Sequence, residues 1–157
     1  MMQISENEIT IVYNSVEDNS LPNTKIFNLV NVIVTDKNYK LRELSVILSN
    51  DELLHKLNHK WLNVDATTDV LSFDLCDDWD KRQIRVSSND LKIIEGEIYI
   101  SLDRVQAQAR ENGIEPETEL LKLIAHGILH LCGMDHDDNV SLREMIDRGE
   151  NYVQRVL

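Results

Sequence analysis

The stretch from Leu120 to His136, LLKLIAHGILHLCGMDH, constrains this chain more than any other part of its sequence. Leucine and isoleucine occupy most of its helical wheel, which predicts a helix that is buried nearly all round. His126 and His130 are four residues apart, so they project from one face of that helix and need polar partners there. Gly133 stands where a left-handed residue can end the helix and redirect the chain.

A turn at Gly133 can bring His136 back toward His126 and His130. Three imidazoles with an open fourth position are the layout of a catalytic zinc site. We therefore predict one zinc ion per chain, bound by His126, His130 and His136. A water on such an ion has a pKa of about 7 and would be the attacking or proton-transferring group.

A second histidine pair, His55 and His59, has the same spacing but different surroundings. On a helix predicted from Asp51 to about Leu62, the pair falls opposite the leucines and Trp61. No turn and no third ligand accompany it. We predict that this pair faces solvent and holds no metal.

The spacing H-x-x-x-H-x-x-G-x-x-H is that of the metzincin proteases. Those enzymes place a glutamate directly after the first histidine as general base. Gly127 occupies that position here and has no side chain that could move a proton. The pattern indicates a protease-like zinc site without the proteolytic base.

The full motif HGILHLCGMDH resembles H-G-x-L-H-L-x-G-x-D-H, the signature of the YbeY family of small bacterial zinc-dependent endoribonucleases, known as ribosomal RNA maturation factors. Two further blocks, Thr68–Phe73 and Gly96–Ser101, agree in order and spacing, so the resemblance covers about residues 40 to 140. It implies a mixed sheet of about four strands packed against the zinc helix. It also implies a single-strand-type endoribonuclease that acts on ribosomal RNA or ribosomal particles. An acidic enzyme of this kind can also depend on a protein partner that presents the substrate.

The sequence departs from this family pattern at two positions. Many members carry an arginine a few residues before the TDVLSF block, where this chain has Leu62. Thr67 stands where proline is usual. A lost arginine removes a planar fork that could bind phosphate.

Three other polar positions are candidates for the site. Asp69 is the candidate proton acceptor, although an aspartate at a strand start also caps its own loop. Asp135 either orients a ligating histidine through its second ring nitrogen or bonds its own turn. Thr68 and Ser72 are weaker candidates for substrate contacts.

Two other functions stay open at this point. One is a zinc metalloprotease-like hydrolase, which Gly127 disfavours. The other is a non-catalytic ribosome assembly factor that uses zinc only to hold its fold.

Net charge and composition limit the functions and cellular locations that this protein can have. The net charge of −12 is unusual for an RNA-binding protein, so positive charge must be local if RNA is the substrate. The candidates for it are Lys56, Lys60, Lys81, Arg82, Arg85, Arg104 and Arg110. No run of 18 apolar residues and no signal peptide is present, and Cys76 and Cys132 are predicted to be reduced thiols, so we expect a cytoplasmic protein without a membrane span.

The order of elements predicts a single α+β domain over residues 1–157, with a zincin-like buried zinc helix and about five helices. The predicted strands are Glu8–Val16, Leu41–Leu48, Asp69–Leu75 and Glu95–Ser101. Helices are predicted to start with a cap at Asn23 or Thr24, a cap within Ser49–Asp51, at Ser101 or Asp103, at Pro116, and with a cap within Asp137–Asn139. The first of them has the predicted apolar stripe Ile26, Leu29, Val30 and Ile33, and the last has Val140, Met145, Ile146, Tyr152, Val153 and Val156. Gly96 indicates a bulge or a close backbone approach, and residues 76–94 give no clear signal.

Overall fold

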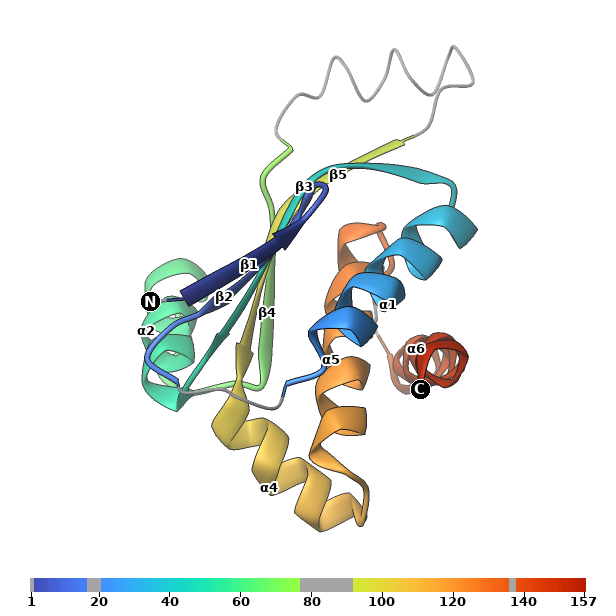
Figure 1. Ribbon diagram of the computed structural model, residues 1–157. Coiled ribbons are helices and arrows are strands. Elements are labelled where there is room, and N and C mark those ends of the chain that lie inside the picture. Colours follow the sequence, from blue (N-terminus) through green and yellow to red (C-terminus); the bar gives the residue numbers. More distant parts are fainter. Residues whose placement is uncertain (1, 17–20, 77–91, 136–137) are drawn as a thin grey trace.

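The computed structural model describes residues 2–16, 21–76, 92–135 and 138–157. Its strands are β1 (Met2–Glu6), β2 (Ile9–Tyr13), β3 (Tyr39–Ser49), β4 (Val70–Asp74) and β5 (Lys92–Ser101). Its helices are α1 (Asn23–Asp36), α2 (Asp51–Leu62), α4 (Leu102–Asn112), α5 (Pro116–Leu131) and α6 (Asn139–Val156) (Figure 1). The predicted α+β class with about five helices is confirmed for these residues.

The five strands form one mixed sheet in the order β1-β2-β3-β5-β4. The inner strands β2, β3 and β5 run parallel, while β1 and β4 pair antiparallel at the two edges. The strand predicted over Glu8–Val16 is present as the shorter β2, but it is not the first strand, because β1 precedes it. The alternation of Met2 and Ile4 with polar residues is too short to predict a strand by itself, and β1 is defined by its pairing with β2.

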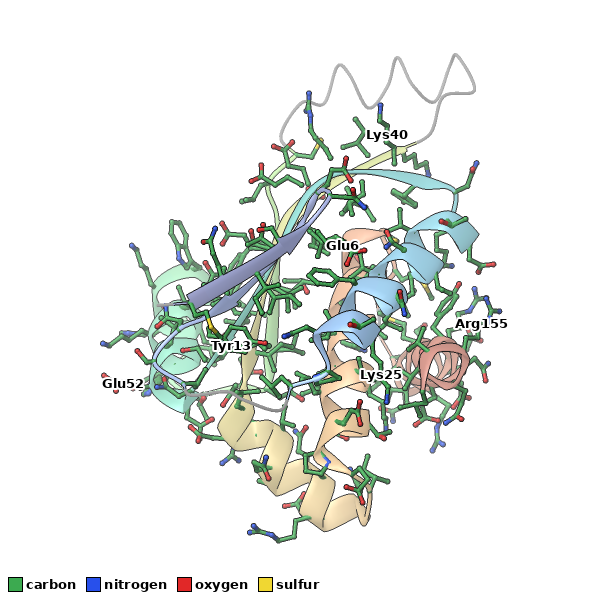
Figure 2. All side chains as sticks on the ribbon, viewed as in Figure 1. Glu6, Tyr13, Lys25, Lys40, Glu52 and Arg155 are labelled. Atoms are coloured by element: carbon green, nitrogen blue, oxygen red, sulfur yellow. The ribbon has the colours of Figure 1, made fainter. Side chains whose placement is uncertain are left out.

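Helices α1, α5 and α6 lie on one face of the sheet, and α2 lies on the other (Figure 1). The predicted stripe of α1 is buried, and α5 is buried on nearly all sides as its sequence predicted. Each fully buried leucine or isoleucine contributes about 1.5–3 kcal/mol, so α5 is a main element of the core. Charged groups such as those of Glu52 and Arg155 point outward (Figure 2).

Local capping follows the sequence at most helix starts. Asn50, Ser101 and Asp138 each accept a hydrogen bond from a backbone N–H three residues on, at 3.0, 3.3 and 2.7 Å. Pro116 opens α5, where its missing N–H costs nothing. The prediction that Asn23 or Thr24 caps α1 was wrong, because α1 has no side-chain cap. The Asn23 side chain instead accepts a hydrogen bond from the Tyr13 hydroxyl.

Gly96 of β5 allows the close backbone approach that its sequence position predicted. A Cβ atom there would lie 2.7 Å from the Phe73 carbonyl oxygen on β4. The irregularity in the sheet lies elsewhere, between Leu41 and Glu43 of β3. The absence of a side chain at Gly96 thus lets β4 and α5 close on β5.

Two of the predicted apolar stripes, on α2 and on α6, are only partly buried. Trp61 was assigned to the buried side of α2, but 61% of its surface is exposed. Val140 and Ile146 of α6 are also exposed, whereas Met145, Tyr152 and Val153 are buried. None of the helices described is long and apolar enough to cross a membrane.

Candidate active site

A cleft of about 850 Å³ opens where edge strand β4 meets α4, α5 and α6. His126 and His130 line it, together with Asp69 and Ser72 from the β4 segment. Leu62, the last residue of α2, lies on its wall. The cleft therefore brings together residues from both halves of the chain, as a catalytic site requires.

The two histidines of α5 point their outer ring nitrogens at each other. The Nε2 atoms of His126 and His130 are 3.1 Å apart, and their rings are steeply inclined at 79°. This distance suits a hydrogen bond between the rings. It also suits shared coordination, because donors at about 2.0–2.1 Å from a tetrahedral ion are themselves about 3.3 Å apart.

The end of α5 has the geometry that the sequence predicted. Gly133 adopts φ +86°, and its N–H donates to the His130 carbonyl at 2.9 Å. The N–H of Met134 donates to the Leu129 carbonyl at 3.0 Å, which completes a Schellman motif. The chain therefore leaves the helix at Gly133. His136, the predicted third ligand, lies outside the described residues.

His126 and His130 are ligands of a type that zinc binds, but two ligands do not complete a zinc site. No group of three or more potential ligands occurs among the described residues. The two imidazoles present are ligands that zinc prefers, and their Nε2 atoms already converge. A complete site requires one more donor, and His136 follows closely after the Gly133 turn.

Asp135 lies beside the inner nitrogen of His130. The distance from Nδ1 of His130 to Oδ1 of Asp135 is 3.5 Å, and the Asp135 side chain is largely exposed. A carboxylate here favours a proton on Nδ1 and leaves the Nε2 lone pair for a ligand. Of its two predicted roles, the orienting one has this contact in its favour.

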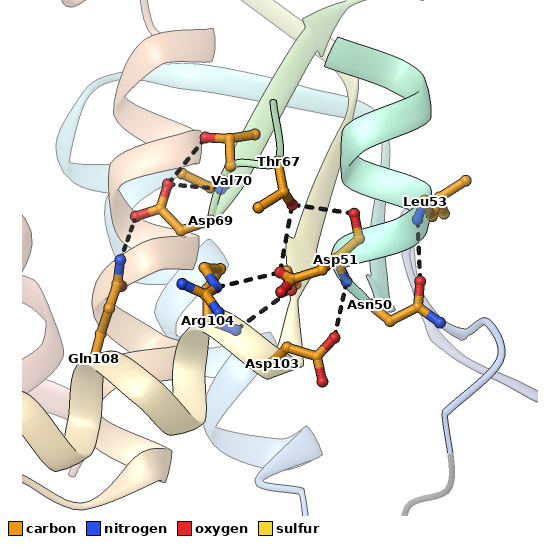
Figure 3. A network of polar contacts seen from close by, with 11 residues as sticks. Asn50, Asp51, Leu53, Thr67, Asp69, Val70, Asp103, Arg104 and Gln108 are labelled. Atoms are coloured by element: carbon orange, nitrogen blue, oxygen red, sulfur yellow. Dashed lines mark hydrogen bonds and ion pairs between the residues drawn. The ribbon is translucent and has the colours of Figure 1, made fainter. Parts of the chain in front are cut away.

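Asp69 is held in place by three hydrogen bonds at the start of β4. Its Oδ1 accepts from the Val70 N–H at 2.8 Å and from the Thr68 hydroxyl at 3.4 Å, and its Oδ2 accepts from Gln108 at 3.2 Å (Figure 3). It thus caps its own strand and also lines the cleft. The two readings of this residue are compatible, because one carboxylate has enough lone pairs for both.

A polar network around Asp51 fixes the loop that leads into β4 (Figure 3). Ser101 donates to the Asp51 carboxylate at 2.7 Å, and Arg104 forms an ion pair with it at 3.2 Å. The Thr67 hydroxyl donates to the Asp51 carbonyl at 3.0 Å. Thr67 therefore ties the loop to the start of α2 by a hydrogen bond.

Gly127 packs directly against the sheet. A Cβ atom there would lie 2.9 Å from a methyl carbon of Ile98 and 3.0 Å from Oγ of Ser72. The Ser72 hydroxyl donates to the Gly127 carbonyl at 3.2 Å, so this candidate substrate contact is already engaged in the fold. The missing proteolytic base thus has a structural reason, since no side chain fits between α5 and β5.

Glu119 and Gln108 are cleft residues that the sequence analysis did not single out. Glu119 is buried, and its Oε2 atom has no hydrogen-bond partner among the described residues. Burial raises the pKa of Glu119, Asp69 and Glu150 act in the same direction, and Lys122 opposes them. Its position seven residues before His126, on the same face of α5, was the signal that could have revealed it.

The described wall of the cleft is acidic. It carries one lysine, Lys122, which forms an ion pair with Glu150 at 3.1 Å. Its carboxylates are Asp69, Asp74, Glu111, Glu119 and Asp135. Lys56, Lys60, Arg104 and Arg110 do not line it, and Lys81, Arg82 and Arg85 lie outside the described residues. The predicted local positive charge is therefore not found in the described part of the cleft.

His55 and His59 are exposed on α2, as predicted, and His55 contacts Asp65 at 2.6 Å. Cys76 and Cys132 form no disulfide, in line with the expected reduced thiols, and neither lines the cleft. The described residues thus place only one of the two histidine pairs in a concave site.

The fold and the cleft are those of a small α+β enzyme, because several titratable side chains lie together in one concave site. A family model described as endoribonuclease YbeY matches residues 11–157. The chain therefore belongs to the YbeY endoribonuclease family, as its motif predicted.

Individual relatives agree with this assignment. The endoribonuclease YbeY of Treponema denticola is 33% identical over 149 residues, which cover 95% of this chain and 93% of that protein. The corresponding protein of Amoebophilus asiaticus is 34% identical over 145 residues, 90% of each chain. The solution structure of TM1509 from Thermotoga maritima has a TM-score of 0.59 and 29% identity, over 93% of this chain and 88% of that one.

Proposed function

We propose that this protein is a zinc-dependent endoribonuclease that cuts single-stranded RNA during ribosomal RNA processing in the cytoplasm. Membership in the YbeY family supports the endoribonuclease role. The observation that carries the proposal is the pair of Nε2 atoms, 3.1 Å apart, that His126 and His130 present in the cleft.

His126, His130 and His136 would hold the ion. When bound, zinc lowers the pKa of a water molecule to about 7 and stabilises negative charge on a phosphoryl oxygen. Asp135 orients His130 through Nδ1, so that Nε2 keeps its lone pair. Asp69 is the proton acceptor, because Gln108 and the backbone N–H of Val70 hold its carboxylate in one orientation in the cleft.

A metalloprotease is the weaker alternative. Its general base would have to follow His126, and the contacts of Gly127 with Ile98 and Ser72 leave no room for a glutamate there. An assembly factor with a structural zinc ion remains the competing hypothesis, because it needs the same ligands but no chemistry.

The acidic cleft bears on how substrate reaches the site. Phosphate repels carboxylates, so free RNA gains little from the described wall of the cleft. A ribosomal particle or a protein partner can supply the positioning that the cleft lacks. We therefore expect low cleavage of naked RNA and higher cleavage on ribosomal particles.

The deciding experiment is a depletion strain scored for unprocessed ribosomal RNA ends and complemented with a His130→Ala copy. The expected result is no rescue by His130→Ala and rescue by the solvent-facing control His59→Ala. Purified protein should in parallel cut RNA on particles and stop when a chelator is added. Full rescue by His130→Ala would instead identify a non-catalytic assembly factor.

Leu62→Arg is expected to raise cleavage of naked RNA. Leu62 is 55% exposed and lines the cleft, so an arginine there reaches the substrate path without burying a charge. A charge-assisted bidentate contact with phosphate is worth about 1.5–3 kcal/mol, which corresponds to roughly a 10- to 100-fold gain. Initial rates on naked RNA and on particles measure the effect.

The matched control is Leu157→Arg, which adds the same charge at another exposed leucine that does not line the cleft. The free energy of unfolding of both variants should lie within about 0.5 kcal/mol of that of the wild type. A folded Leu62→Arg variant that cuts naked RNA no faster than Leu157→Arg would exclude residue 62 as the cause of weak activity.

A further inference from the structure

The last turn of α2 presents a large aromatic side chain to solvent. Trp61 is seven residues after Leu54, so both lie on the same face of the helix. Leu54 is fully buried, but Trp61 is 61% exposed, and the neighbouring Leu62 and Val64 are 55% and 45% exposed. The face with which α2 packs on the sheet therefore continues beyond the packed region as an exposed apolar surface.

The backbone under this surface is firmly held. Asn63 takes a left-handed conformation with φ +57°, and the Val64 N–H donates to the Asn58 carbonyl at 3.1 Å. The buried Asn58 side chain donates to the Ala66 carbonyl at 3.0 Å. These bonds fix the turn that follows Trp61, so its indole is displayed from a pre-organised support.

The charge around Trp61 differs from that of the cleft. Between Leu54 and Val64 the chain carries two lysines and two histidines, of which Lys56 pairs with Glu52 at 3.2 Å and His55 with Asp65 at 2.6 Å. The ammonium group of Lys60 lies 5.0 Å from the centre of the Trp61 ring. An exposed aromatic ring beside a cation is the combination with which proteins bind single-stranded nucleic acid, where bases stack on the ring and phosphates meet the cation.

The surface is also continuous with the candidate active site. Leu62 follows Trp61 directly and lines the cleft that contains His126, His130 and Asp69. Trp61 does not itself line the cleft, but as the residue next to Leu62 it lies beside the cleft wall.

We propose that Trp61 and Lys60 form a base-stacking site that holds one nucleotide of single-stranded RNA next to the cleft. The inference rests on the proposed function for its substrate class. It assigns to α2 the binding energy and positive charge that the acidic cleft does not provide.

The test measures RNA binding separately from cleavage. The chain has two tryptophans, Trp61 and Trp79, so a Trp79→Phe protein carries Trp61 as its sole tryptophan. Non-cleavable 2′-O-methyl 12-mers of adenosine and of uridine are titrated into it at low salt. Stacking is expected to quench the Trp61 fluorescence at the same RNA concentrations that raise the anisotropy of a labelled 12-mer.

Substitutions then test the ring itself. Trp61→Ala should weaken binding about 5- to 30-fold, whereas Trp61→Phe, which keeps a stacking face, should lose much less. Val140→Ala removes an equally exposed apolar side chain outside the cleft wall and should bind like the wild type. Because Trp61 is exposed, circular dichroism and thermal unfolding should be unchanged in all variants.

Failure of this inference and failure of the nuclease proposal give different results. Quenching by RNA without any cleavage would leave the stacking site in place and overturn the nuclease. Cleavage without quenching, with Trp61→Ala binding the 12-mers like the wild type, would overturn the stacking site. If Trp61→Ala loses association with ribosomal particles while free RNA never quenches Trp61, the surface contacts protein and the RNA proposal is also overturned.

Discussion

His126→Ala is expected to remove the zinc ion from the purified protein and to lower RNA cleavage about a hundred- to a thousandfold. The physical reason is that His126 and His130 supply two of the three proposed ligands, with their Nε2 atoms 3.1 Å apart. Loss of one of three histidines destroys the site. A bound metal ion contributes several kcal/mol to catalysis of this kind, and each 1.36 kcal/mol is a factor of ten in rate.

Elemental analysis of zinc and rates on ribosomal particles measure both effects. His55→Ala and His59→Ala are the matched controls, because these residues repeat the spacing on exposed positions of α2. Both should keep about one zinc per chain and full activity. His136→Ala should behave like His126→Ala. Equal loss of zinc from His55→Ala, or a wild-type protein that cuts RNA without metal, would contradict the assignment.

Gly127→Glu, which inserts the general base of a metzincin protease, is expected to unfold the protein rather than make it a protease. Even the Cβ of Gly127→Ala would meet Ile98 at 2.9 Å and Ser72 at 3.0 Å. Overpacking of this kind costs about 1–3 kcal/mol, from which the better helix propensity of alanine recovers about 1 kcal/mol. The glutamate adds a buried charge, so its cost should exceed about 3 kcal/mol.

Urea unfolding with a comparison to Gly149→Ala tests this expectation. Gly149 is also a buried helical glycine, but its added Cβ would meet only the Cβ of Ala125, at an ordinary 3.5 Å. Gly149→Ala should therefore be neutral or stabilising by up to about 1 kcal/mol. If Gly127→Ala is as stable as Gly149→Ala, the close packing of α5 on β5 does not explain why glycine stands after the first histidine.

The acidic cleft requires another source of the positive charge that binds RNA. A nuclease whose described cleft wall has several carboxylates and one paired lysine depends on charge from elsewhere. The bound ion, the surface around Trp61 and the ribosomal particle are three distinct sources. The zinc variants remove the first source, Trp61→Ala removes the second, and assays with and without particles vary the third. Leu62→Arg adds a further positive charge in the cleft wall.

Features that depend on neighbours within a few residues could be predicted from the amino-acid sequence alone. The spacing of His126 and His130 puts both rings on one helical face, and Gly133 ends α5 in a Schellman motif. The caps at Asn50 and Ser101 follow from side chains that reach an N–H three residues on. These predictions succeeded because the partners are fixed by the local geometry of the chain.

Features that depend on residues far apart in the sequence became visible only in the folded chain. Strand β1 forms through its pairing with β2, and the short alternation of Met2 and Ile4 with polar residues did not predict it. Trp61 belongs to the apolar face of α2, yet it is exposed because the packed surface ends before the last helical turn. Glu119 becomes a cleft residue only when β4, α4 and α6 close around α5, since a helical wheel describes a face but not what covers it.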